Sequence, residues 1–65
     1  MAAEPLREVY FEHIVLGDSV KVVAIDSVTA IEVSIVGPAR AMKSDLERVA
    51  LQKLRAKLAR ELANR

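Results

Sequence analysis

The sequence lacks several residues that small proteins commonly use for stability or chemistry. Its 65 residues include no cysteine, no tryptophan and a single histidine. Without cysteine no disulfide can form, and one histidine cannot supply the usual ligands of a zinc site. Small domains supplement a thin core with disulfides, metals or partner subunits, and here the partner subunit is the support that remains. We expect neither a metal nor another cofactor.

Long apolar segments are also missing. The longest unbroken apolar run is Val22 to Ile25, whereas a membrane-spanning helix needs about 20 apolar residues. The first residues, MAAEPLRE, are acidic and contain a proline, where a signal peptide is basic and then apolar. Cysteine-free composition fits a reducing compartment. Together these features predict a cytoplasmic protein that does not contact membranes.

Residues 7–36 have the composition and alternation of three β-strands. Gly17-Asp18 suits a two-residue hairpin turn, because glycine is favoured at the first central position. Directly paired residues share one face of a sheet. The pairs about this turn are Val15 with Val20, His13 with Val22, and Phe11 with Ala24.

The second turn lacks glycine but has a well-specified register. A four-residue loop over 27–30 places Ala24 opposite Val33 and Val22 opposite Ile35, and a one-residue slip would put polar side chains into this apolar face. The last loop residue, Ala30, is then expected in the left-handed region at a cost of about 1 kcal/mol. The side chains of Asp26 and Thr29 can bond the loop backbone.

A C-terminal helix follows the third strand. Gly37-Pro38 ends the strand, and Ser44 with Glu47 forms a capping box that predicts a helix from about Asp45 to about Ala63. Its apolar stripe, which matches the apolar face of the sheet, comprises Leu46, Ala50, Leu51, Leu54, Leu58 and Leu62.

The predicted fold is therefore α+β. It is a three-stranded antiparallel β-meander packed on one C-terminal α-helix, in the order β-β-β-α. We expect residues 1–65 to form a single small domain, with a frayed N-terminus over 1–6, the sheet over about 7–36 and the helix over about 44–63.

The stretch EVYFEHIVLGDSVKVVAIDSVTAIEVSIVGPA, followed by a Leu/Ala/Arg-rich helix, carries a family resemblance. It resembles a group of short, uncharacterised alphaproteobacterial proteins that contain a domain of unknown function. The resemblance covers most of the chain, from about Glu8 into the helix. It supports the predicted fold and implies no activity, catalytic residue or ligand.

The residues that carry catalysis are scarce. Nucleophilic catalysis needs an activated side chain beside an oriented base, and the one candidate base near neutral pH, His13, falls mid-strand on the face predicted to meet the helix. No glycine-rich phosphate loop exists, because the only glycines are Gly17 and Gly37. We expect that the protein is not an enzyme and has no catalytic residues.

The opposite face of the predicted sheet is unusually apolar for a surface that meets only water. Tyr10, Ile14, Val23 and Ile25 fall on it, and one helix cannot cover both sides of a sheet. Exposed apolar surface of this kind commonly marks a protein contact. These four residues are the candidate protein interface, for a weak homodimer or another protein partner.

The helix offers a second candidate surface. Charge is uneven along the chain, since residues 37–65 hold eight basic residues against three acidic ones. The candidate nucleic-acid contacts on the helix are Arg48, Lys53, Arg55, Lys57 and Arg60. Binding through them would be phosphate-driven and weakly specific. We therefore predict a small protein-interaction module, with weak nucleic-acid binding through the helix as the alternative.

Overall fold

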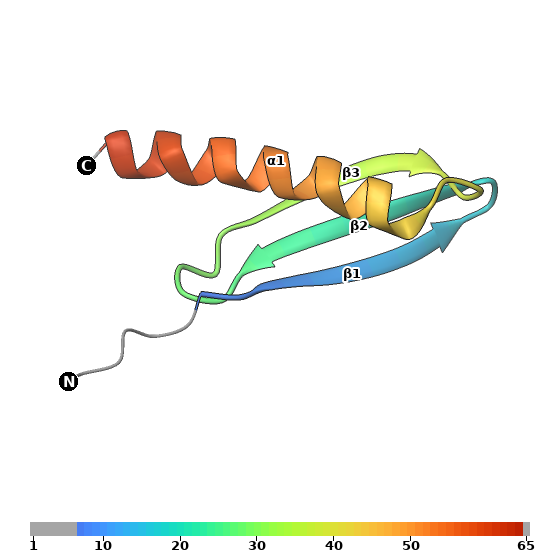
Figure 1. Cartoon of the computed structure of the whole chain (residues 1–65), viewed down its shortest axis with the longest axis horizontal. Helices are drawn as coiled ribbons and strands as arrows, with labels where there is room; N and C mark the ends of the chain where they lie inside the picture. The colour runs from blue at the N-terminus through green and yellow to red at the C-terminus, as the bar shows by residue number, and fades with distance from the viewer. Residues whose placement is uncertain (1–6, 65) are drawn as a thin grey trace.

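The computed structural model describes residues 7–64, and the frayed end expected over residues 1–6 lies outside this range. Three strands, β1 (Val9–Leu16), β2 (Ser19–Asp26) and β3 (Glu32–Pro38), precede one helix, α1 (Lys43–Ala63). The strands form an antiparallel sheet in the order β1-β2-β3. The helix lies on one side of this sheet, over β2 and β3 (Figure 1). The predicted β-β-β-α fold is confirmed.

The register of both hairpins agrees with the prediction. Val15 pairs with Val20 across the first turn, and Ala24 pairs with Val33 across the second. Gly17 adopts the positive φ of 61° that favours glycine in the first turn. Because side chains alternate between faces along a strand, this register brings Phe11, Ala24 and Val33 of the three strands to the same face.

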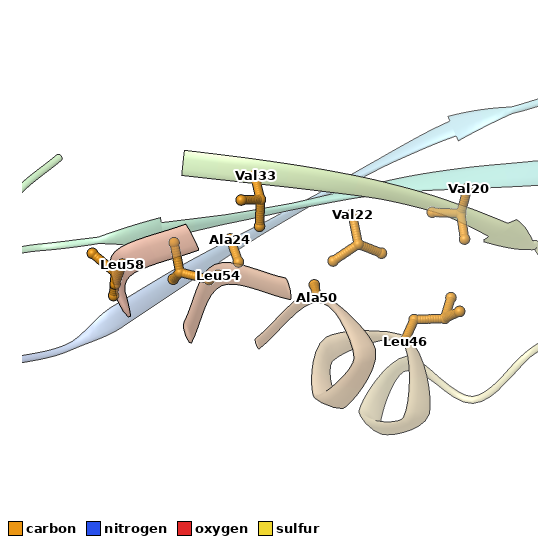
Figure 2. Close-up of a cluster of buried hydrophobic side chains, with 8 residues drawn as sticks. All are labelled: Val20, Val22, Ala24, Val33, Leu46, Ala50, Leu54 and Leu58. Carbon is orange, nitrogen blue, oxygen red and sulfur yellow. The ribbon is translucent and has the colours of Figure 1, made fainter. Parts of the chain in front are cut away.

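A core of eight apolar side chains lies between the sheet and the helix. Figure 2 shows four of them descending from the sheet and four rising from α1. The strands contribute Val20, Val22, Ala24 and Val33, and the helix contributes Leu46, Ala50, Leu54 and Leu58. The four helix positions recur every four residues, so they form one stripe along α1. Small Ala50 and Ala24 let the helix approach the central strand closely.

Two residues of the predicted stripe fall outside this core. Leu51 is only partly buried, and Leu62 is 56% exposed. Figure 1 shows the reason for Leu62, because the C-terminal end of α1 projects beyond the sheet. The prediction that Leu62 packs on the sheet is therefore wrong.

The predicted capping box is also wrong. The helix begins at Lys43 and its N-cap is Met42, which makes no side-chain capping hydrogen bond. Ser44 thus lies inside the first turn and is exposed. Glu47 does not turn back to the helix start, because its Oε2 lies 3.2 Å from Nε2 of His13 on β1. Because Glu47 contacts His13 on the sheet, its side chain does not reach the backbone position that a capping box requires.

The third strand includes Gly37 and ends at Pro38, slightly beyond the end of the sheet predicted at about residue 36. Proline is tolerated there because β3 is an edge strand. Gly37 faces α1, and a Cβ built on it would lie 2.5 Å from Cδ2 of Leu46. The missing side chain lets the start of the helix come close to the end of β3.

The loop between β2 and β3 is organised by a buried carboxylate. Oδ2 of Asp26 accepts hydrogen bonds from the backbone N–H and the hydroxyl of Thr29, at 2.9 and 2.7 Å. Oδ1 has no hydrogen-bond donor among the described residues, but it lies 3.0 Å from Nε of Arg7. The hydroxyl of Thr29 in turn accepts from the N–H of Ile31 at 3.2 Å. These contacts confirm the expected role of Asp26 and Thr29 in the loop.

Ala30 closes this loop in the left-handed region, with a φ of 62°, as the sequence predicts. Its N–H donates to the carbonyl of Asp26 at 2.8 Å. No other non-glycine residue among those described has a positive φ. The strain is accepted because the register and the Asp26 contacts leave this residue no other conformation.

No helix within residues 7–64 combines the length and the apolar character needed to span a membrane.

We predict that Ala30→Gly is neutral or stabilises the fold by up to about 1 kcal/mol, because glycine removes the steric cost of the left-handed conformation. Part of this gain is offset by the larger conformational entropy of glycine in the unfolded chain. Denaturant midpoints of the two proteins measure the difference. A clear loss of stability in the glycine variant contradicts the account of the loop.

We predict that Ser44→Ala changes stability by less than about 0.5 kcal/mol, because both residues are tolerated within a helix. A serine that caps the helix would instead cost roughly 0.5–2 kcal/mol on removal. Chemical denaturation, followed by circular dichroism, separates the two cases. A loss in the larger range would place the helix start at Ser44 after all.

The ionisation of Asp26 links the stability of the fold to pH. The hydrogen bonds from Thr29, together with the charge of Arg7, lower the pKa of Asp26 in spite of its burial. A carboxyl group whose pKa is lower in the folded state stabilises the fold above its unfolded pKa of about 4. This stability is lost as the pH falls below that value and through the folded pKa.

Asp26→Asn should therefore be less stable than the wild type at neutral pH and should lose less of its stability between about pH 5 and pH 2. Urea denaturation at a series of pH values measures this. Asp18→Asn, which changes an exposed carboxylate in the other hairpin loop, is the matched control and should keep the wild-type acid dependence. Equal acid dependence in the wild type and Asp26→Asn contradicts the assignment.

Candidate interaction surface

The face of the sheet away from α1, called the outer face from here on, is formed by alternate residues of the three strands. Those on β1 are Tyr10, Glu12, Ile14 and Leu16; those on β2 are Ser19, Lys21, Val23 and Ile25; and those on β3 are Glu32, Ser34, Val36 and Pro38. Half of these twelve side chains are apolar or aromatic residues other than proline. Solvated sheet faces are usually polar at these positions.

The apolar side chains of the outer face are open to solvent to different degrees. Val36 is 66% exposed, Tyr10 56% and Ile14 36%, whereas Val23 and Ile25 on the central strand are partly buried by their neighbours. All four residues predicted as the interface, Tyr10, Ile14, Val23 and Ile25, lie on this one face. The structure therefore brings the predicted residues together.

Leu16 is an outer-face residue that the sequence prediction did not include. It is 55% exposed and pairs with Ser19 beside the first turn. The alternation that places Ile14 on the outer face also places Leu16 there, so the signal was present in the sequence. Leu16 extends the apolar surface of β1 to the end of the strand.

A shallow hollow of about 420 Å³ lies over the middle of the outer face. Its lining mixes the apolar side chains of Ile14, Val23 and Ile25 with charged groups of both signs. The charged residues of the lining are Glu12, Lys21 and Glu32. The hollow therefore combines apolar side chains, which can pack against another molecule, with charged side chains, which can select for complementary charges.

The three charged groups of the hollow have no ion-pair partner within the part of the chain that the structure describes. The ion pairs among residues 7–64 join Arg7 with Asp26, His13 with Glu47, and Arg48 with Asp45. Lys21 and its acidic neighbours therefore keep their charges available to another molecule.

Tyr10 adds a polar group to one end of the outer face. The carboxylate of Glu8 raises the pKa of Tyr10, because it accepts a hydrogen bond from the phenol and its charge disfavours the phenolate. The ring and the hydroxyl make Tyr10 an amphipathic side chain. Tyrosine of this kind is enriched at protein interfaces.

His13 lies on the other face of the sheet, as predicted. Its side chain is 21% exposed and its Nε2 approaches the carboxylate of Glu47 on α1. When the imidazole is protonated, this contact is an ion pair between β1 and the helix. His13 therefore connects β1 to α1 through its contact with Glu47.

The basic residues of the helix are partly committed to the fold. Nζ of Lys53 donates to the carbonyl of Ser34 at 2.7 Å, and Nζ of Lys57 donates to the carbonyl of Glu32 at 3.3 Å. Both carbonyls belong to the free edge of β3. Lysines that cover a sheet edge protect it from pairing with another chain.

The remaining basic candidates differ in their contacts. Arg48 pairs with Asp45 one turn earlier on the helix. Arg55 and Arg60 are exposed, and Arg60 lies in the last turn, where a cation offsets the helix dipole. The structure thus gives structural roles to most of the residues predicted to contact nucleic acid.

Comparison with known proteins identifies a family for the chain but no individual curated protein or solved structure. No curated protein and no solved structure matches the chain. The family described as "Domain of unknown function (DUF6898)" matches residues 6–61. This range includes all three strands and nearly all of α1, so the predicted resemblance to a domain of unknown function is confirmed. The chain therefore belongs to the DUF6898 family of domains of unknown function.

Proposed function

We propose that this chain is a small protein-interaction module that associates with a second copy of itself through the outer face. The observation that carries the proposal is the apolar surface of that face. Tyr10, Ile14, Leu16 and Val36 are exposed there, and Val23 and Ile25 are partly buried between them. Apolar surface removed from water contributes about 25 cal/mol per Å². In a domain this small, covering the outer face adds substantially to a thin core.

A second copy fits this face because the face carries charges of both signs. Lys21 lies within the same hollow as Glu12 and Glu32. A surface with both signs is able to complement a copy of itself, whereas a surface of one sign repels it. The role needs no catalytic group or cofactor, and the cysteine-free composition suits a reducing compartment such as the cytoplasm.

The size of the face indicates a weak, reversible dimer. Three strands of about eight residues span roughly 14 by 27 Å, or about 400 Å² of flat area per copy. Two such faces bury less than the roughly 1,200 Å² at the lower limit of stable interfaces. The dimer should therefore form at raised protein concentration.

Nucleic-acid binding through the helix is the weaker alternative. Lys53 and Lys57 each use one donor on a β3 carbonyl, which ties these two ammonium groups to the edge of the sheet. The outer face does not offer a second route, because its carboxylates would lie near phosphates. No aromatic stacking platform accompanies the basic residues of the helix, since the chain has one tyrosine and one phenylalanine and both lie on β1.

The proposal predicts that Ile25→Lys weakens self-association at least about tenfold, because it places a charge among the apolar side chains of the central strand within the contact. Sedimentation of wild type and variant across a concentration series up to about 1 mM measures the effect. Val36→Lys, at a more exposed position of the same face, should act in the same direction. Circular dichroism checks that both variants remain folded.

Val49→Lys is the matched control. Val49 is a 49% exposed residue of α1, on the other side of the sheet, so this variant should associate like the wild type. A wild type that stays monomeric throughout the series contradicts self-association and leaves a different protein as the partner. Equal association of the wild type and Ile25→Lys excludes the outer face.

A further inference from the structure

The register arranges the outer face as rows that run across the three strands. One row holds Tyr10, Ile25 and Glu32, and the next holds Glu12, Val23 and Ser34; a third holds Ile14, Lys21 and Val36, and the last holds Leu16, Ser19 and Pro38. Neighbouring rows are roughly 6.6 Å apart, and neighbouring strands about 4.8 Å. Negative charge collects in the first two rows, together with Glu8, whereas the only cation lies in the third.

Two identical faces can stack about a two-fold axis that runs either along the strands or across them. An axis along the central strand places each row over the same row of the second copy. Lys21 then faces Lys21, and the acidic end of one face lies over the acidic end of the other. Like charges held opposite each other destabilise a contact.

An axis across the strands, between the second and third rows, has the opposite effect. It places the second row of one copy over the third row of the other. Lys21 of one copy then stands over Val23 of the second copy, one strand away from Glu12 of that copy. The acidic ends of the two faces lie at opposite ends of the interface, and Tyr10 meets Leu16.

We propose that the dimer has this second arrangement, with Lys21 of each copy paired with Glu12 of the other. The inference rests on the self-association proposed above and adds its geometry and its charge pairing. Neither Lys21 nor Glu12 has an ion-pair partner among residues 7–64, so the pairing breaks no contact within the described chain. Two face-to-face antiparallel sheets with an apolar layer between them form a β-sandwich.

Complementary single variants test the pairing. Lys21→Glu alone places only carboxylates at the two contacts, and Glu12→Lys alone places only ammonium groups there. Each variant by itself should dimerise at least about tenfold more weakly than the wild type. An equimolar mixture should dimerise like the wild type, because each contact then joins opposite charges. Sedimentation at low ionic strength measures this, since salt screens exposed pairs.

The double variant Glu12→Lys/Lys21→Glu should also regain wild-type association, which shows that neither substitution damages the fold. Glu32→Lys is the matched control, because it makes the same charge change on the same face but lies opposite Pro38 in this arrangement. A mixture of Glu32→Lys with Lys21→Glu should not regain association.

The outcomes separate the geometry from the proposed function. A monomeric wild type contradicts self-association itself. A wild type that dimerises, but that binds Lys21→Glu more tightly than it binds itself, requires the axis along the strands, because that axis places residue 21 of one copy over residue 21 of the other. This result overturns the arrangement. Equal rescue of Lys21→Glu by Glu12→Lys and by Glu32→Lys overturns the specific pairing and leaves only a general charge effect.

Discussion

The structure depends on one constraint, which is that a single helix covers one face of a three-stranded sheet. The two hairpins bring every second side chain of each strand to that face. The helix α1 completes the core with one buried residue per turn. Everything else follows from which side of the sheet the helix occupies. The opposite face carries the same β-rich sequence, and no element within residues 7–64 covers it.

The loop between β2 and β3 maintains this arrangement at a local cost. The buried carboxylate of Asp26 accepts two hydrogen bonds from Thr29 in the loop, and it lies close to the guanidinium of Arg7. Ala30 accepts a left-handed conformation that glycine adopts more easily. A loop one residue longer or shorter would turn the inner-face side chains of β3 to the outer face, and the strain at one residue is small beside the loss of an apolar face.

Several charged side chains of α1 contact the sheet. Glu47 reaches His13 on β1, while Lys53 and Lys57 reach the carbonyls of β3 on the other flank. These side chains position the helix and cover a sheet edge. The charged side chains of Glu12, Lys21 and Glu32 on the outer face, by contrast, have no ion-pair partner among residues 7–64.

The sequence by itself determined the strands, both turns, the pairing register, the left-handed Ala30 and the composition of the outer face. These features are local or follow from strict alternation, so short segments specify them. Tertiary structure alone decided that Glu47 contacts His13 and does not serve as a capping residue. It also decided where the buried stripe of α1 ends, because the C-terminal end of the helix projects beyond the sheet and leaves Leu62 exposed. Tertiary structure also placed Lys53 and Lys57 against the backbone carbonyls of β3. Contacts between residues far apart in the chain set these features, and no local pattern records such contacts.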